Sequence, residues 1–417
     1  MPGVARHRLH IAVAVLTTVV AARAAAPPAP PTPVFPGRSW ARAAPSAVGL
    51  NETKLDAFRA FLGPESHGVV VRYGRLAYSW GAFTERHDVA SAVKPTFAHF
   101  LMLALERGYI SSVDDAVVDW EPRLATLNAA LGHKDRNITW RHMANQISCY
   151  EIAALPGTAF DYNDWQMELF FQTLVLKAWG RGLRGQGKTL TLEEANAELL
   201  QRTLAEPIGC EDTPTWLYYG NKSSIGRLGI SNRDFARIGL LYLGGGKWGG
   251  AADGKQQQQQ LISEEHVRLV TRDPVPLSVP RAGEGGTSGA AAEIIAGIGS
   301  LGSTKQPDNQ AAHNGSYSWT WWLNEEQATG RLFRPTAPPD LYGAFGDGRY
   351  GPSTMSVLPS QEMVVSWNHA VWKSWNVSKE NEAFRLLMEA VLRIFYYLAA
   401  FLCHSSQKNR CKLGEFG

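Results

Sequence analysis

Ser91-Ala92-Val93-Lys94 places a serine hydroxyl three residues before a lysine amine. A serine hydroxyl is a weak nucleophile at neutral pH and needs a neighbouring group that takes its proton. Residues three apart share one face of a helical turn, so the amine can reach the hydroxyl. Burial would lower the pKa of Lys94 toward the value that a general base needs, and the helix N-terminus would offer N–H groups to an oxyanion. The pattern predicts acyl transfer to Ser91, activated by Lys94.

The elements around Ser91 distinguish this motif from a chance match. Residues 405–408 (SSQK) have the same spacing but lie in a polar tail. Before Ser91, residues 68–81 alternate as two strands joined by a tight turn at Tyr73-Gly74. After it, residues 95–107 predict a mostly apolar, buried helix. A nucleophile between a hairpin and a buried helix has the rigid setting that the chemistry requires.

The rest of the chain predicts a helical middle with strands at both ends. The predicted helices are 164–179, 192–204, 232–243 and about 379–402, and the later strands are 319–323, 354–358 and 363–367. We therefore expect an α/β (α+β) fold, in which an antiparallel sheet flanked by helices holds an inserted all-helical domain. The sheet domain would comprise residues 41–110 and 295–402, and the insert 111–294, with a Gly/Gln-rich loop near 244–260.

The N-terminus predicts export. Residues 1–24 combine Arg6 and Arg8, an apolar run and the small residues of Ala22-Arg23-Ala24, as a cleaved signal peptide does. The apolar run is about half the length of a membrane span, so we expect no stable membrane anchor. Residues 25–40 form a Pro-rich linker, and residues 403–417 a tail. The protein would then be secreted, to the periplasm or the cell exterior.

The charge balance gives no reason to expect nucleic acid as a partner. The formal net charge is +3, and residues 1–24 hold three of the 41 basic residues, which leaves 38 against 38 acidic ones. A neutral body does not attract polyanions. The expected partner is a small ester, amide or peptide substrate, and the oligomeric state stays open.

Four cysteines suit an exported protein. Cys149 and Cys210 lie in the body and Cys403 and Cys411 in the tail, so we expect a Cys149–Cys210 disulfide and, with free thiols as the alternative, a second one in the tail. The cysteines have no metal-ligand spacing, and the histidines form no His-x-x-x-His pair. We therefore expect neither a metal site nor a cofactor.

The segment 73–96 resembles the serine β-lactamase and penicillin-binding-protein superfamily, which includes class C β-lactamases and family VIII esterases. In that superfamily a glycine turn, a strand and a short loop lead to the nucleophile. The resemblance covers about 300 residues in the expected order. It continues through the following segments: 108–110, 114–115, 138–143, 156–162, 207–209, 319–322 and the last two strands.

The superfamily's second motif, Tyr-x-Asn, follows a Pro-Gly-Thr-x-Phe stretch. Here residues 156–160 supply that stretch and Tyr162 the tyrosine, which the resemblance implies shares proton transfer with Lys94. In the superfamily the asparagine orients a substrate carbonyl, so the resemblance implies a substrate-binding role for Asp164, which replaces it. An ionised carboxylate accepts hydrogen bonds where an amide can donate one. Tyr219-Gly220-Asn221 matches the spelling without the context and is the weaker alternative.

The third motif, Lys/His-Thr/Ser-Gly, should lie on the strand beside the nucleophile. In order of sequence it falls on Ala344-Phe345-Gly346, where Gly346 can serve as the close-approach glycine but Ala344 supplies no cation. The resemblance implies an oxyanion hole made of the Ser91 N–H and one N–H of this strand. His313-Asn314-Gly315 spells a similar motif, which predicts a loop turn, with His313 in the cleft as the alternative.

These observations predict a secreted serine hydrolase that forms an acyl-enzyme on Ser91 and acts as an esterase or amidase. A penicillin-binding D-Ala-D-Ala peptidase or β-lactamase is the alternative, which needs a cation such as His313 or Arg349 in the cleft. A catalytically inactive binding protein of the same fold is the third hypothesis, because two motifs are degraded.

Overall fold

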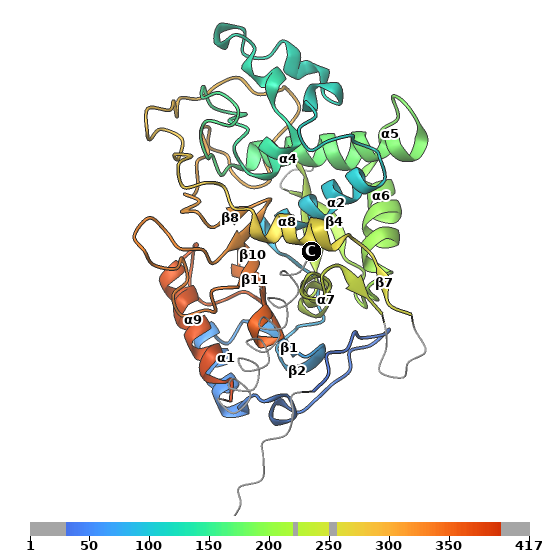
Figure 1. The fold of residues 1–417 in the computed structure, drawn as a ribbon, viewed down its shortest axis with the longest axis vertical. Coiled ribbons are helices and arrows are strands. Elements are labelled where there is room, and N and C mark those ends of the chain that lie inside the picture. Colours follow the sequence, from blue (N-terminus) through green and yellow to red (C-terminus); the bar gives the residue numbers. More distant parts are fainter. Residues whose placement is uncertain (1–30, 220–223, 250–256, 393–417) are drawn as a thin grey trace, which may run out of the picture.

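The computed structural model describes residues 31–219, 224–249 and 257–392, and its centre is a seven-stranded antiparallel sheet (Figure 1). The strands run in the order β2-β1-β12-β11-β10-β9-β8. Their bounds are β1 His67–Arg72, β2 Arg75–Trp80, β8 Tyr317–Ser318, β9 Trp321–Leu323, β10 Tyr342–Gly348, β11 Gly351–Leu358 and β12 Met363–Asn368. The N-terminal hairpin therefore joins the C-terminal strands, as predicted.

Strand β1, from the N-terminal part of the described chain, pairs with β12, from its C-terminal part. Val70 lies opposite Val365 in this antiparallel ladder, and both side chains are fully buried. Burial on both faces of the sheet explains why β1 and β12 are apolar along most of their length.

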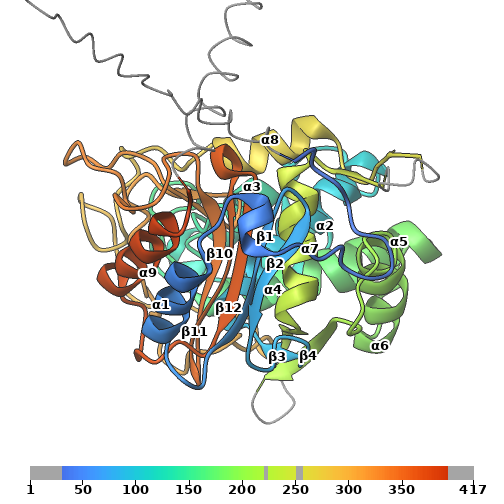
Figure 2. The ribbon, with the colours of Figure 1, turned by 90° about the horizontal axis from the view of Figure 1, so that it is seen from below.

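Helices cover both faces of the sheet, as Figure 2 shows. Helices α1 (Glu52–Leu62) and α9 (Val377–Glu389) lie together on one face, and α7 (Asn232–Leu243) lies on the other. At Gly239 of α7 a Cβ atom would lie 2.6 Å from Val364 Cγ1, so glycine is what allows the helix to approach β12 this closely. The sequence predicted α7 with these bounds but assigned it to the inserted helical domain, residues 111–294, and not to the sheet domain.

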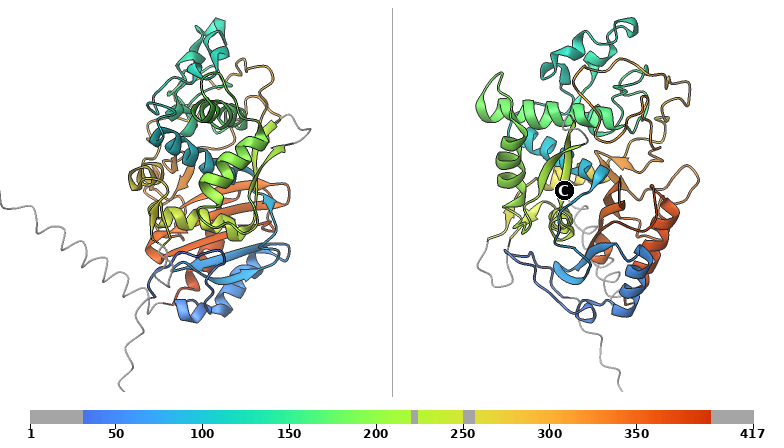
Figure 3. Two further views of the ribbon diagram at one scale, coloured as in Figure 1. Left: turned by 90° about the vertical axis from the view of Figure 1, so that its right-hand side faces the viewer. Right: turned by 180° about the vertical axis from the view of Figure 1, so that it is seen from behind.

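A mainly helical region lies beyond the sheet, in the upper part of both views of Figure 3. Its helices are α2 Lys94–Glu106, α3 Trp140–Ala144, α4 Asp164–Phe171, α5 Trp179–Arg184 and α6 Leu192–Ala195, and α8 Glu264–Arg272 packs near β8 and β9. π-helical segments Gln172–Ala178 and Asn196–Ala205 continue α4 and α6. The expected helices 95–107, 164–179 and 192–204 are thus present.

A three-stranded sheet in the order β3-β5-β4 was not predicted. It consists of β3 (His87–Asp88), β4 (Thr215–Tyr219) and β5 (Ser224–Ile230). The short strands β6 (Lys247–Trp248) and β7 (Gln259–Gln260) pair within the segment expected to be a loop.

The predicted Cys149–Cys210 disulfide is wrong, because both cysteines are free thiols. Cys149 is buried in a small cluster with Ile152 and Ala282, and its Sγ faces the Ala159 carbonyl oxygen at 3.5 Å. Cys210 packs against the main hydrophobic core. The two thiols thus belong to separate clusters, and burial raises the pKa of Cys149 to about 12.

Several predictions fall outside the described residues: the signal peptide 1–24, residues 25–30 of the linker, the helix beyond residue 392, and the tail with Cys403 and Cys411. Among the residues that are described, no helix combines the length and apolar character needed to cross a membrane.

Candidate active site

Ser91 lies where the small sheet meets the start of α2. Strand β3 ends at Asp88, whose Oδ1 accepts a hydrogen bond from the Ala90 N–H at 2.9 Å. Ala90 adopts a φ of 52°, the left-handed region that a non-glycine residue rarely occupies. The 3₁₀ turn Ala90–Val93 then leads directly into α2. This tight turn leaves Ser91 half-buried at the wall of two cavities.

The Lys94 side chain is buried and contacts the serine. Its Nζ donates to Ser91 Oγ at 2.7 Å and to Asp164 Oδ1 at 2.9 Å. Lys94 is 1% exposed and Asp164 is 6% exposed, so this ion pair lies almost entirely out of water. Asp164, which sequence reasoning assigned to substrate binding, therefore holds Lys94.

The ion pair determines the charge of Lys94. Burial lowers the pKa of this ammonium, but the Asp164 carboxylate and the Tyr162 side chain outweigh burial, so the net pKa is raised. Burial likewise raises the pKa of Asp164, but Lys94, together with smaller effects of Arg227 and Gln310, outweighs burial, so the net pKa of Asp164 is lowered. The expectation of a lowered Lys94 pKa is wrong, because the sequence did not show a carboxylate facing the amine.

Tyr162 lies over the same amine. The Lys94 Nζ is 4.5 Å from the centroid of the Tyr162 ring, and the ring packs at 5.7 Å from that of Trp322. Tyr162 lines the narrower cavity together with Ser91. The alternative residue, Tyr219, instead lines the wider cavity, with the Arg227 guanidinium 4.7 Å from its ring centroid.

Strand β10 passes against the turn that carries Ser91. A Cβ atom at Gly346 would overlap the Val89 carbonyl oxygen and would lie 2.7 Å from Ala92 N and 3.0 Å from Ser91 N. Only glycine allows this approach, so the structure places Gly346 where the sequence predicted a close-approach glycine.

The edge of β10 beside Ser91 presents a backbone amide. Backbone groups alternate in direction along an antiparallel strand. The Pro352 carbonyl accepts a hydrogen bond from the Ala370 N–H, so it points to the β12 side of β11. Asp347 lies opposite Pro352 in the β10–β11 ladder, so the N–H of Asp347 points away from β11. Within the described residues, β9 pairs with β10 at Tyr342 and Gly343 alone, so no strand there lies opposite the Asp347 amide.

Of the other residues predicted for the third motif, one lies in the hydrophobic core and another lines a cavity. Ala344 is buried in the main core and lines neither cavity, whereas Phe345 lines the narrower one. His313 does not line either cavity: its Nε2 lies 2.8 Å from the Val279 carbonyl oxygen, and its Nδ1 accepts from the Gly315 N–H at 3.0 Å. His313 therefore holds a loop turn, as expected, and the alternative that it binds substrate in the cleft is wrong.

Two cavities open at Ser91. The narrower, of about 310 Å³, has an aromatic wall that includes Trp322, Phe345 and Trp375. The wider, of about 970 Å³, is mostly polar and is lined by Asp164, Arg227 and Arg349 among others. Arg227 is held by Asp88 at 2.9 Å and 3.0 Å, whereas Arg349 makes no ion pair within the described part of the chain.

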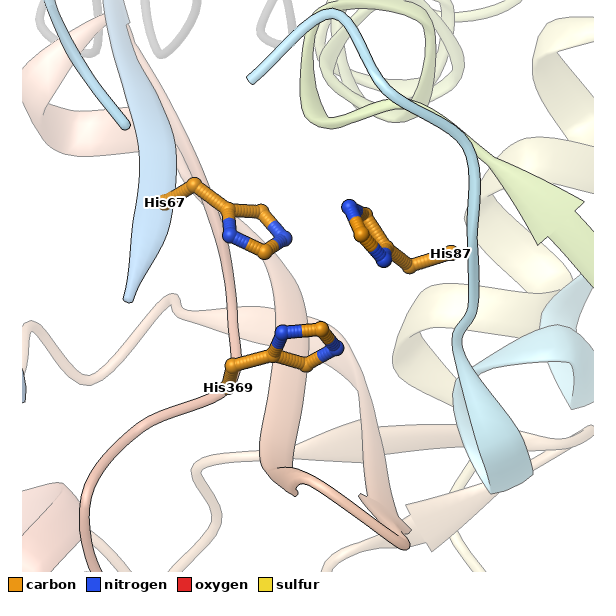
Figure 4. A group of neighbouring side chains, drawn as sticks. All are labelled: His67, His87 and His369. Carbon is orange, nitrogen blue, oxygen red and sulfur yellow. The ribbon is translucent and has the colours of Figure 1, made fainter. Parts of the chain in front are cut away.

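Sequence reasoning missed one group in this region, the three histidines His67, His87 and His369 (Figure 4). Their rings point toward one another, although they come from β1, from β3 and from the loop that follows β12. Local spacing does not reveal such a cluster. The sequence offered one indication of the cluster: His67 and His369 adjoin predicted strands, and His87 lies shortly before the Ser91 motif.

Comparison with solved structures identifies the fold. A protein from Bacteroides dorei assigned as a β-lactamase aligns with 82% of this chain and 99% of its own, with a TM-score of 0.51 and 16% identity. A protein from Bacillus anthracis assigned as a 6-aminohexanoate-dimer hydrolase aligns with 81% of each chain, with a TM-score of 0.50 and 16% identity. No protein-family model and no curated protein sequence matches the chain. The chain therefore has the fold of the serine β-lactamases and penicillin-binding proteins.

Proposed function

We propose that this protein is a serine hydrolase that cleaves small esters or amides through an acyl-enzyme on Ser91. The observation that carries the proposal is the 2.7 Å contact between Ser91 Oγ and Lys94 Nζ at the meeting point of two cavities. A nucleophile and its proton partner within hydrogen-bond reach, with room for a substrate beside them, are the components of nucleophilic catalysis.

The proposed mechanism begins with the neutral amine of Lys94. The ammonium, which Asp164 holds at 2.9 Å, reaches this form by giving its proton to solvent. The amine takes the Ser91 proton as Oγ bonds to the substrate carbonyl carbon, and Lys94 and Tyr162 return a proton to the leaving group as its bond to that carbon breaks. Water then attacks the acyl carbon and gives a proton to the Lys94 amine, and the bond to Ser91 Oγ breaks as that oxygen takes the proton back, which releases the acid.

The Ser91 and Asp347 N–H groups would bind the oxyanion of each tetrahedral intermediate. The second donor, the Asp347 N–H, lies one residue after the segment Ala344–Gly346, in which the superfamily resemblance implied it. Donors that are rigid before the reaction stabilise the developing charge without reorganising, which is why backbone amides serve well here.

The cavities support a substrate with a compact apolar acyl group. A volume of about 310 Å³ lined by Trp322, Phe345 and Trp375 suits a short aliphatic or aromatic chain. The relative from Bacillus anthracis is assigned to hydrolysis of a 6-aminohexanoate dimer, which supports an amide as one substrate class. We also propose that the protein is secreted, for which the composition of residues 1–24 is the support.

Hydrolysis assays test this proposal. The chain is expected to hydrolyse short-chain nitrophenyl esters faster than the β-lactam nitrocefin, and Ser91→Ala is expected to lower kcat/KM at least about 1,000-fold. Preference for nitrocefin would favour the β-lactamase alternative. No turnover above Ser91→Ala with esters, amides or nitrocefin would favour the binding-protein alternative.

Arg349 supports the second candidate, a peptidase for substrates that end in a carboxylate. It lines the wider cavity with Ser91 and has no carboxylate partner among the described residues, so it is free to pair with an anionic substrate. Arg349→Ala is expected to raise KM up to about 5-fold for a D-Ala-D-Ala peptide and to leave KM for a neutral nitrophenyl ester unchanged. Equal effects on both substrates would contradict this role of Arg349.

A further inference from the structure

The three histidines of Figure 4 form a compact group of possible metal ligands. One ring nitrogen of each of His67, His87 and His369 lies within 4.8 Å of the others. The ring centroids are 4.2 Å apart for His67 and His87, 4.5 Å for His67 and His369, and 4.6 Å for His87 and His369. Three imidazoles from separate elements thus share one small volume.

Two ring nitrogens in this group lack a partner. Nε2 of His67 and Nε2 of His87 are buried without a hydrogen bond. Buried polar atoms in folded proteins are nearly always satisfied, so each unpaired one calls for an explanation such as an ion. A single cation between the rings would satisfy both.

A carboxylate lies beside the group. The Glu85 carboxylate lies 4.0 Å from His87 Nε2 and adds negative charge nearby.

We propose that His67, His87 and His369 bind one Zn²⁺ ion, with an open coordination position that faces the wider cavity. Imidazole nitrogen suits zinc, whereas calcium and magnesium prefer oxygen ligands. His87 and His369 line the same cavity as Ser91, so the fourth ligand would be water or an anionic group of a molecule bound there. Three protein ligands with one open position are the arrangement of reactive rather than structural zinc sites.

Metal binding by the full chain, produced without an added histidine tag, tests this proposal. Equilibrium dialysis against Zn²⁺ is expected to give one tightly bound ion per chain. Substituted Co²⁺ is expected to show the visible absorption of four coordination, and added azide is expected to shift that absorption by occupying the open position. An azide-insensitive spectrum would contradict the open position.

A matched pair of variants separates this site from adventitious binding. His369 and His133 both adopt a φ of 57°, a conformation that asparagine tolerates. His369→Asn is expected to weaken zinc binding about 100-fold or more, and His133→Asn to leave it unchanged. If His369→Asn proves unstable by thermal melting, His87→Gln takes its place. Equal zinc affinity in wild type and in the folded cluster variant would overturn the proposal, whatever the hydrolase assays show.

Discussion

At the scale of single residues, the position of Asp164 changes the chemistry expected of Lys94. The sequence showed that a carboxylate replaces the usual asparagine of the second motif. It did not show which way that carboxylate points, because its direction depends on how the start of α4 packs against α2. In the structure it faces Lys94 at 2.9 Å and holds the ammonium form.

Asp164→Asn is expected to shift the pH dependence of hydrolysis toward lower pH. The base form of Lys94 is the neutral amine, and its pKa is raised in the presence of Asp164. Removal of the carboxylate leaves burial, which lowers this pKa, as the dominant effect. The ascending limb of kcat/KM against pH, measured with a neutral nitrophenyl ester, should therefore move to lower pH.

The control for this variant is Asp114→Asn, which removes the exposed partner of Arg141. It makes the same chemical change far from the amine and should leave the profile unmoved. An unchanged limb in Asp164→Asn would show that Lys94 is not the titrating base.

At the scale of elements, strongly patterned segments were predicted well and others were not. The hairpin β1–β2, helix α2 and helix α7 match the predicted segments closely, because their apolar periodicity or alternation is sustained. Strands β4 and β5 were missed inside a helical stretch, although Trp216, Tyr218 and Tyr219 are β-favouring types. Their pairing is a contact between segments, which local pattern does not contain.

Gly346→Ala tests the contact between β10 and the Ser91 turn. The new methyl group would overlap the Val89 carbonyl oxygen and would push β10 away from the backbone nitrogen of Ser91. A displacement of about 1 Å at a reacting group can cost 10²-fold, so we expect kcat/KM to fall about 100-fold or more.

Gly348→Ala is the control on the same strand. A Cβ atom there meets nothing closer than 3.5 Å, so activity should stay close to wild type. Comparable losses in the two variants would contradict a special role for the approach at Gly346.

At the scale of the whole molecule, the fold brings together groups that are distant along the chain. The superfamily resemblance predicted the sheet and the arrangement of its helices, and the structure has that fold. The histidine cluster and a group of buried carboxyls, Glu151, Asp161 and Asp308, were not predicted. Both arise from tertiary packing, which no local motif records.

The buried carboxyls predict that the protein loses stability as pH rises. Burial raises the pKa of Glu151 to about 8 and that of Asp161 to about 7, and it also raises that of Asp308. The folded chain then binds protons that the unfolded chain has released, so the contribution of these carboxyls to stability is full below about pH 4, falls as pH rises, and is lost once pH passes about 7 to 8. The melting temperature should therefore be lower at about pH 8.5 than at about pH 5.

Glu151→Gln should reduce this fall in melting temperature. Glu151 Oε1 accepts a hydrogen bond from the Asp308 N–H, and a glutamine keeps an acceptor there without a charge. Glu284→Gln, in an exposed loop, serves as the control and should leave the fall as it is. Calorimetry at constant ionic strength measures both, and an equal fall in Glu151→Gln and wild type would refute the assignment.

A fluorophosphonate probe tests, without knowledge of the substrate, whether Ser91 is an activated nucleophile. Attack by Ser91 Oγ on phosphorus displaces fluoride and leaves a stable adduct. Mass spectrometry of the digested protein is expected to find one phosphonylated residue, Ser91, in the wild type, strongly reduced labelling in Lys94→Ala, and none in Ser91→Ala. Absence of labelling in the folded wild-type protein, or labelling that persists in Ser91→Ala, would contradict the account.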